Sequence, residues 1–208
     1  MMKRTASNVA WLAAVTHIVA SFAMLLLLRR GLPGFPEAER LAYIHANRAA
    51  WIAGWTCWQI AAISLLALYV VLALRFGRTA PVLSGTALVV AAAGFAMDFA
   101  SEARYIAILP ELQGEAFAAL DRELEVLIGY AANGLYTVAF ALLVVAGWRE
   151  LPKLALALAG PVAAAGVALA IASLRHDARL EVITSAILFP VFTLWIMVVA
   201  QWLRREPQ

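Results

Sequence analysis

Six long apolar runs constrain what this chain can fold into more than any other feature of its sequence. They occupy about 9–28, 50–74, 82–100, 128–148, 154–174 and 180–203. About 20 apolar residues in a helix cross a bilayer, and in lipid every backbone amide and carbonyl needs a partner within the protein. Barrel strands would be shorter and would alternate in polarity. The sequence therefore predicts an all-α integral membrane protein, a single domain over 1–208 built as a bundle of six transmembrane helices with one or two short interfacial helices.

The first apolar run shares one feature with a secretory signal: the basic residues Lys3 and Arg4 precede it. A signal has a shorter apolar region that ends in small residues at a cleavage site. Here the run ends in four leucines followed by Arg29 and Arg30. We therefore expect the segment to be retained as a transmembrane helix.

Two connections carry helical patterns of their own. Between the third and fourth runs, apolar residues recur at helical spacing among acidic ones: Leu112, Ala116, Phe117, Leu120, Leu124, Leu127 and Ile128. This pattern predicts an amphipathic helix at the membrane surface. A second helix is predicted to begin at Glu37 after Pro36, because proline and acidic residues favour a first turn, and it can continue into the second span.

Composition excludes several classes of protein. Hydrophobic residues make up 64% of the chain and charged residues 14%, which departs from soluble proteins. The net charge of +3 comes from arginines that flank the apolar runs, as in membrane anchoring, so we expect the lipid bilayer as partner and no nucleic acid. Cys57 is the single cysteine, no span holds a metal-binding motif, and no span holds the lysine that a retinal Schiff base needs.

The lysines and arginines bear on orientation, although eight of them fall on each side of the membrane. We favour cytoplasmic termini, because the basic residues on that side, such as Arg75 and Arg78, lie in short loops or terminal stubs beside the spans. The acidic amphipathic segment also fits the outer leaflet better, since the cytoplasmic membrane surface is negative. The expected location is a bacterial inner membrane.

Asp98 is the most unusual residue within a predicted span, because an ionised carboxylate at mid-bilayer costs about 2.5–3.5 kcal/mol on insertion scales. It shares a helix face with small residues and with Glu102 one turn later, so this face should pack inward and the two carboxyl groups can share a proton. We predict Asp98 and Glu102 as a candidate catalytic pair. A structural role stays open, in which both pair with Arg48, Arg104 or Arg179 to tie loops together.

Polar and aromatic side chains gather on the side of the odd-numbered connections. The candidate ligand-binding residues there are His45, Asn47, Arg48, Trp51, Trp55, Gln59, Arg104, Tyr105, Tyr130, Asn133, His176 and Arg179. Together they predict a pocket with aromatic walls and a polar floor. Tryptophans also collect at membrane interfaces as anchors, so that interpretation of Trp51, Trp55 and Trp58 stays open.

His17 is the most deeply placed histidine, in the middle of the first predicted span. Such a residue usually bonds to a neighbouring helix. Histidine chemistry also permits a tetrapyrrole ligand, but a bis-histidine haem needs a second histidine at matching depth, and His45 and His176 fall near helix ends. We therefore predict no cofactor.

Three functions remain open at this stage. The leading hypothesis is a membrane protein that binds or handles a small, partly apolar or lipid-like molecule in an outward-facing polar pocket. The second is an intramembrane enzyme that uses Asp98 and Glu102 as acid and base on a lipophilic substrate. The third is an accessory subunit, or a homo-oligomer, whose small-residue faces bind partner helices, as around Gly166 and Ala170 of the fifth span.

Overall fold

The computed structural model describes the backbone of residues 2–205 and the side chains of residues 4–205, so the side chain of Lys3 lies outside the described residues. All described elements are helical. The α-helices are α1 (Met2–Ala23), α2 (Glu37–Ala46), α3 (Arg48–Phe76), α4 (Pro81–Ala107), α5 (Gly114–Glu125), α6 (Asn133–Ala146), α7 (Lys153–Leu174) and α8 (Ala178–Arg205). Short π or 3₁₀ segments are η1 (Met24–Leu28), η2 (Arg29–Gly31), η3 (Leu109–Glu111) and η4 (Val126–Ala132).

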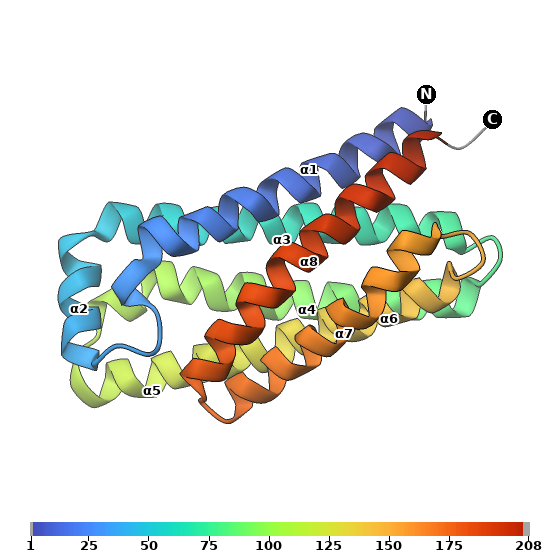
Figure 1. Ribbon diagram of the computed structural model, residues 1–208. Helices are drawn as coiled ribbons and strands as arrows, with labels where there is room; N and C mark the ends of the chain where they lie inside the picture. Colours follow the sequence, from blue (N-terminus) through green and yellow to red (C-terminus); the bar gives the residue numbers. More distant parts are fainter. Residues whose placement is uncertain (1, 206–208) are drawn as a thin grey trace.

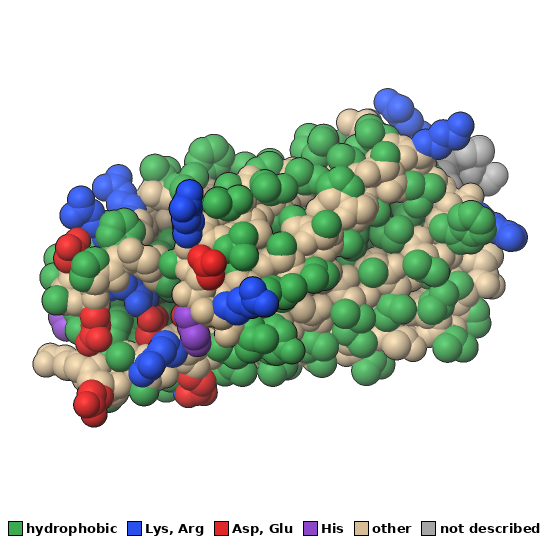
Figure 2. Space-filling model, turned by 60° about the horizontal axis from the view of Figure 1, so that its bottom comes forward, with side chains coloured by type: hydrophobic (Ala, Val, Ile, Leu, Met, Phe, Trp, Pro, Cys, Tyr) green, Lys and Arg blue, Asp and Glu red, His purple; other side chains and the backbone are tan. Residues whose placement is uncertain are grey.

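Six of the helical stretches are long and apolar enough to cross a membrane, which confirms the predicted all-α six-helix bundle. Large apolar side chains face outward along them; Leu25 is 70% exposed, Leu74 71% and Val82 78%. Figure 2 shows hydrophobic side chains along the middle of one face of the molecule and most charged ones toward its two ends. Such a surface suits hydrocarbon between two polar boundaries. The chain is a multi-pass membrane protein.

The spanning helices form a closed ring in chain order. Each packs against the next, from α1 through α3, α4, the η4–α6 stretch and α7 to α8, and α8 returns to α1. Figure 1 shows α1 and α8 meeting beside the two termini. There the Ser7 hydroxyl donates to the Ala200 carbonyl at 3.0 Å. The ring therefore surrounds an interior space, which is partly open to the outside.

The main apolar core fills the ring toward the termini. Its fully buried large side chains include Leu68, Leu72, Phe76, Leu143 and Trp195, each at most 1% exposed. These residues come from α3, α6 and α8, so they join helices that are not all neighbours in sequence. Burial on this scale fixes the ring at one end.

A second apolar cluster lies at the opposite end, where α2, η2, η3 and α5 cover the spans; we call this part of the fold the cap (left in Figure 1). Its centre is Trp51, whose indole N–H donates to the Tyr105 carbonyl at 2.8 Å. Phe117 and Leu124 of α5 are fully buried against it. The cap therefore has a core of its own.

Two boundaries differ from the sequence prediction. The predicted amphipathic surface helix is α5, but it continues through η4 and α6 as one helix of 33 residues from Gly114 to Ala146, because its apolar stripe packs in the cap instead of on lipid. The third span does not end near Ala100 but continues to Ala107. Its charged residues are accommodated by burial or by ion pairing, and the helix ends just before Pro110, which cannot donate a helical hydrogen bond.

The small residues of α7 pack within the chain. A side chain at Gly166 would collide with Thr137 of α6, and the Asn133 amide donates to the Gly166 carbonyl at 2.8 Å. This part of the predicted partner-binding face is therefore occupied by α6.

Candidate functional site

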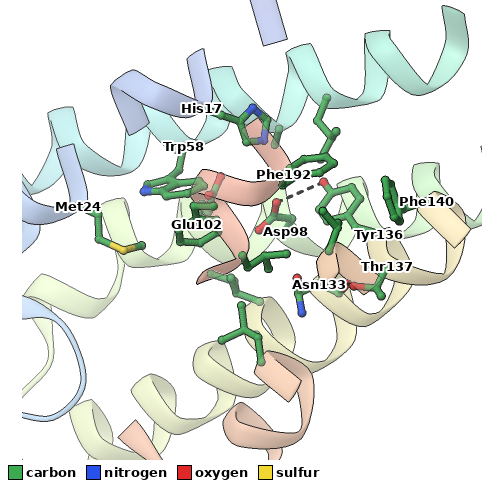
Figure 3. Close-up of a pocket in the computed structure, with 18 of the residues that line it drawn as sticks. His17, Met24, Trp58, Asp98, Glu102, Asn133, Tyr136, Thr137, Phe140 and Phe192 are labelled. Carbon is green, nitrogen blue, oxygen red and sulfur yellow. Dashed lines mark hydrogen bonds between the residues drawn. The ribbon is translucent and has the colours of Figure 1, made fainter. Parts of the chain in front are cut away.

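A cavity of ≈ 170 Å³ lies inside the ring, between the main core and the cap. Side chains from α1, α3, α4, α6, α7 and α8 all line it. On the same scale one water molecule needs about 10–15 Å³, so the space suits a small molecule. Most of the wall is apolar, and the polar groups are few (Figure 3).

Asp98 and Glu102 both line this cavity, as the helical spacing on α4 predicts. Asp98 accepts a hydrogen bond from the Tyr136 hydroxyl at 3.2 Å. Glu102 is only 2% exposed, and its Oε2 atom has no hydrogen-bond partner among the described residues. A buried acceptor left unsatisfied costs about 1–3 kcal/mol. The buried carboxyl group of Glu102 therefore lowers the stability of the fold.

Small residues on α4 bring the carboxylates to the cavity. Ala87 and Ala91 are fully buried on the same face as Asp98. Next to them, a Cβ atom at Gly94 would lie 3.2 Å from the Ala132 carbonyl oxygen. This close approach lets Tyr136 reach Asp98 across the helix interface.

Aromatic rings from four helices, α1, α3, α6 and α8, form much of the cavity wall. Trp58 of α3 lies against Phe189 of α8, with ring centroids 4.9 Å apart. Phe192 packs against His17 of α1 in an edge contact at 5.6 Å. The indole nitrogen of Trp58 is buried and has no hydrogen-bond partner among the described residues. The wall thus presents ring faces and an unused N–H donor.

Trp55 connects the cavity to the cap. Its ring stacks on Tyr105 at 4.4 Å with an interplanar angle of 4°, and its indole nitrogen also has no partner among the described residues. Tyr105 itself belongs to the cap cluster. Trp55 thus belongs both to the cap cluster and to the cavity wall.

His17 lines the cavity from α1. Its Nδ1 atom lies 2.8 Å from the Ala13 carbonyl oxygen, which can only accept, so Nδ1 carries a hydrogen. The neutral ring then has its lone pair at Nε2. The other two histidines lie in the cap region, where His45 bonds to the Pro110 carbonyl and His176 to Glu125. Neither lines the cavity with His17.

Two π-helical segments border the cavity. Met24 lines it from η1, and Ile128 and Gly129 line it from η4. π-Helical turns are rare and occur frequently at functional sites, because the extra residue shifts the side chains that follow. Ser173 occupies the place that a Cβ atom at Gly129 would need, so this glycine is required by packing.

The predicted site residues divide between cavity and cap. Asp98, Glu102, Trp55 and Asn133 line the cavity, together with His17. Sequence reasoning did not assign Met24, Tyr69, Tyr136, Thr137, Phe140, Phe189 or Phe192, which also line it. These residues are apolar or lie inside apolar runs, so their sequence context predicts only that they belong to a membrane span.

The remaining predicted residues lie outside the cavity. Several hold the cap together: Arg48 pairs with Glu111 at 2.6 Å, and Arg104 pairs with Glu123 at 2.6 Å. The Asn47 amide bonds to the Tyr43 carbonyl between α2 and α3. Others lie half-buried or exposed away from the cavity: Gln59, Tyr130 and Arg179. Arg48 and Arg104 thus bind acids other than Asp98 and Glu102.

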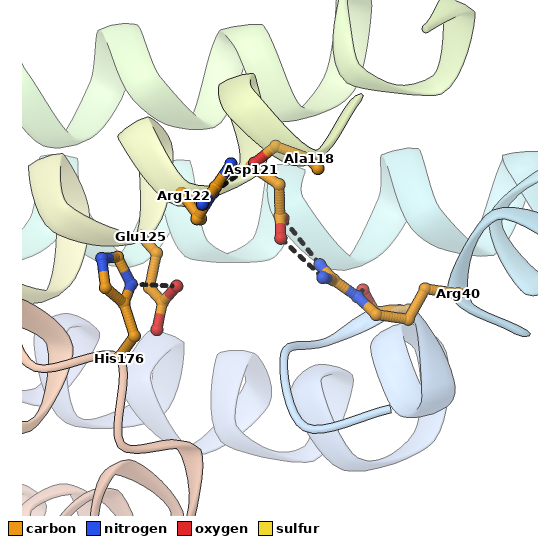
Figure 4. A network of polar contacts seen from close by, with 7 residues as sticks. Arg40, Ala118, Asp121, Arg122, Glu125 and His176 are labelled. Atoms are coloured by element: carbon orange, nitrogen blue, oxygen red, sulfur yellow. Dashed lines mark hydrogen bonds and ion pairs between the residues drawn. The ribbon is translucent and has the colours of Figure 1, made fainter. Parts of the chain in front are cut away.

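A buried ion pair that the sequence did not indicate stabilises the cap. Arg40 of α2 donates two hydrogen bonds to the Asp121 carboxylate of α5, at 2.5 and 2.6 Å, and a third to the Gly31 carbonyl at 3.0 Å (Figure 4). Burial acts to lower the pKa of Arg40, but the hydrogen bonds and negative charge of Asp121 outweigh it and raise the pKa above its usual value. This guanidinium stays charged.

The site is thus a mostly apolar cavity inside a ring of membrane helices, with one carboxylate oxygen and two indole N–H groups that the described residues leave unpaired. These groups can bind a molecule with both apolar and polar parts. No protein-family model, curated protein or solved structure matches this chain.

Proposed function

We propose that this membrane protein binds or handles a small, partly apolar or lipid-like molecule in the cavity beside Asp98 and Glu102. The observation that carries the proposal is the Oε2 atom of Glu102, which is buried, unpaired among the described residues and part of a cavity wall. An unpaired carboxylate oxygen in an apolar site gains free energy when a bound molecule donates to it.

We further propose that the protein lies in a bacterial inner membrane with both termini in the cytoplasm. The acidic residues of α5 support this orientation, because they would face the negative cytoplasmic surface in the opposite one. In the proposed orientation the cap is on the outer side, and the bound molecule enters from that leaflet or from the outside.

The test compares molecules that co-purify with the wild-type protein and with the Asp98→Asn/Glu102→Gln double variant, using native mass spectrometry in a mild detergent. These substitutions keep the shape of each side chain and remove its charge. We expect the wild-type protein to carry a bound small molecule or lipid that the double variant loses. Glu115→Gln is the matched control, because Glu115 is an exposed carboxylate on α5.

Circular dichroism first checks that both variants keep their helical content. Equal retention by the folded double variant and the wild-type protein, together with an unchanged phenotype of the double variant in cells, would refute the proposal. A wild-type protein that carries no bound molecule even after reconstitution with a total bacterial lipid extract would also refute it.

An intramembrane enzyme is the second candidate, and one observation favours it. The hydrogen bond between Tyr136 and Asp98 places a phenol beside a carboxyl group, and the imidazole of His17 lines the same cavity. Such groups can act as acid and base on a membrane-dissolved substrate. Product formation from an isoprenoid or sterol library, measured across pH, tests this role. A pH profile that both substitutions leave unchanged would remove the two carboxyl groups from the chemistry.

A further inference from the structure

The acidic side chains of the cavity have no lysine or arginine beside them among the described residues that line it. Asp98 and Glu102 contribute the two carboxyl groups. The Tyr136 hydroxyl already donates to Asp98, so the donors still unpaired among the cavity atoms are the indole N–H groups of Trp55 and Trp58. A ligand that donates to the Oε2 atom of Glu102 would therefore satisfy the unpaired acceptor of this wall.

Three arginines near the cavity's end of the bundle are directed to other acids. At the cap end, Arg40 is bonded to Asp121, Arg48 to Glu111 and Arg104 to Glu123. A buried negative charge without a nearby positive one is costly in a low-dielectric site. Positive charge for the carboxyl pair must therefore come either from a proton or from a bound molecule.

The walls are suited to an organic cation. Trp58, Phe189, Phe192 and Tyr136 all line the cavity, and an ammonium group within about 6 Å of such ring faces is stabilised by cation–π attraction. Apart from Asn133, Thr137 and the carboxyl pair, most of the remaining wall is apolar or aromatic, which suits an apolar body attached to the charged group.

We infer that the ligand of this cavity is a small apolar molecule that carries an ammonium group, with the ammonium beside Glu102 and Asp98 and the apolar body between the aromatic rings. This inference rests on the proposed function and adds the chemical class of the ligand. The N–H groups of the ammonium donate to the free Oε2 atom of Glu102, and its charge offsets that of the carboxyl pair.

The test uses two probes that differ in one group, 4-phenylbutylamine and 4-phenylbutan-1-ol. Each is titrated by calorimetry into the full-length protein in lipid nanodiscs, with empty nanodiscs as the correction for partitioning. We expect the amine to bind the wild-type protein at least about tenfold more tightly than the alcohol, which corresponds to about 1.4 kcal/mol. Glu102→Gln should abolish this preference and change the alcohol affinity by less than about twofold. Glu115→Gln should leave both affinities unchanged.

The outcomes separate the two proposals. Equal affinities of the wild-type protein for amine and alcohol would overturn the ammonium inference and leave small-molecule binding intact. Binding of neither probe would count against both. An amine preference that survives in Glu102→Gln and in Asp98→Asn would overturn the assignment of the carboxyl groups. If Glu102→Gln fails to fold, the amine and alcohol affinities of the wild-type protein and of Asp98→Asn still test the ammonium inference.

Discussion

Replacing Asp121 by asparagine should open the cap without unfolding the ring. The substitution keeps the size of the side chain but removes the charge that Arg40 faces. Arg40 and Asp121 have side-chain exposures of 7% and 8%, and their two hydrogen bonds are 2.5 and 2.6 Å long. Removing one partner of such a buried pair typically costs about 3–5 kcal/mol, because the other charge stays buried without compensation.

An exposed ion pair of the same cap provides the comparison. Arg48 and Glu111 are 2.6 Å apart, but their side chains are 40% and 63% exposed. Solvent screens such pairs, which contribute about 0–1 kcal/mol. Glu111→Gln should therefore have a small effect, although its charge change equals that of Asp121→Asn.

Hydrogen exchange measured by mass spectrometry distinguishes opening of the cap from global unfolding. In Asp121→Asn, the opening free energy of the amides of α2 and α5 should fall by about 3–5 kcal/mol, or to zero where it is smaller than that. The amides of α3 and α8 near the main core should keep their protection. Glu111→Gln should match the wild-type protein.

The double variant Arg40→Met/Asp121→Leu gives the deciding comparison, since it removes both charges and restores apolar contacts. Its cap should recover most of the lost protection. Protection in α2 that is unchanged by Asp121→Asn would refute the argument that this pair holds the cap. A double variant as open as the single one would show that packing, and not charge, is the cause.

Three further substitutions and one control test the ring and its cavity through the thermal unfolding midpoint in nanodiscs. Gly94→Val should lower stability by about 1–3 kcal/mol by overpacking the helix interface. Gly160→Val is the control and should be near neutral, because a Cβ atom there meets nothing within 4 Å. Equal midpoints of the two variants would contradict the close contact at Gly94. Tyr136→Phe removes the donor to Asp98 and should cost about 1–3 kcal/mol, and an unchanged midpoint would show that this bond contributes nothing. Glu102→Leu should raise stability by about 1–3 kcal/mol and abolish ligand retention, because it removes an unsatisfied acceptor; a lower midpoint would reveal a structural role for the carboxylate.

The helical spans could be predicted from the sequence because the physics that sets them is local. A run of about 20 apolar residues must form a helix in lipid, whatever surrounds it. The end of the third span could not be predicted in this way. Ser101, Glu102 and Arg104 interrupt the apolar run, yet α4 continues through them because Glu102 is buried and Arg104 pairs with Glu123. The partner of Arg104 and much of what buries Glu102 lie on other segments of the chain.

The candidate site was predictable only in part, for the same reason. Asp98 and Glu102 stand out in any apolar run, and their spacing alone places them on one helix face. The aromatic residues of α8 that face them carry no such mark. No sequence pattern indicates the π-helical form of η4 or the close approach of Ser173 of α7 to Gly129. The pairing of Arg40 with Asp121 joins residues 81 positions apart.

Two buried acidic side chains of this protein, Asp121 and Glu102, have very different surroundings. In the cap, Arg40 and Asp121 satisfy each other with two hydrogen bonds, and a backbone carbonyl accepts a third from Arg40. One turn of α4 away from the cap residue Tyr105, Glu102 keeps an oxygen with no partner among the described residues. A fold that can supply an arginine to a buried aspartate could satisfy a glutamate by the same means, or replace it by leucine at a gain in stability. Proteins retain such a cost mainly where it serves function, so the unpaired carboxylate is a stronger indication of a site than the cavity volume is.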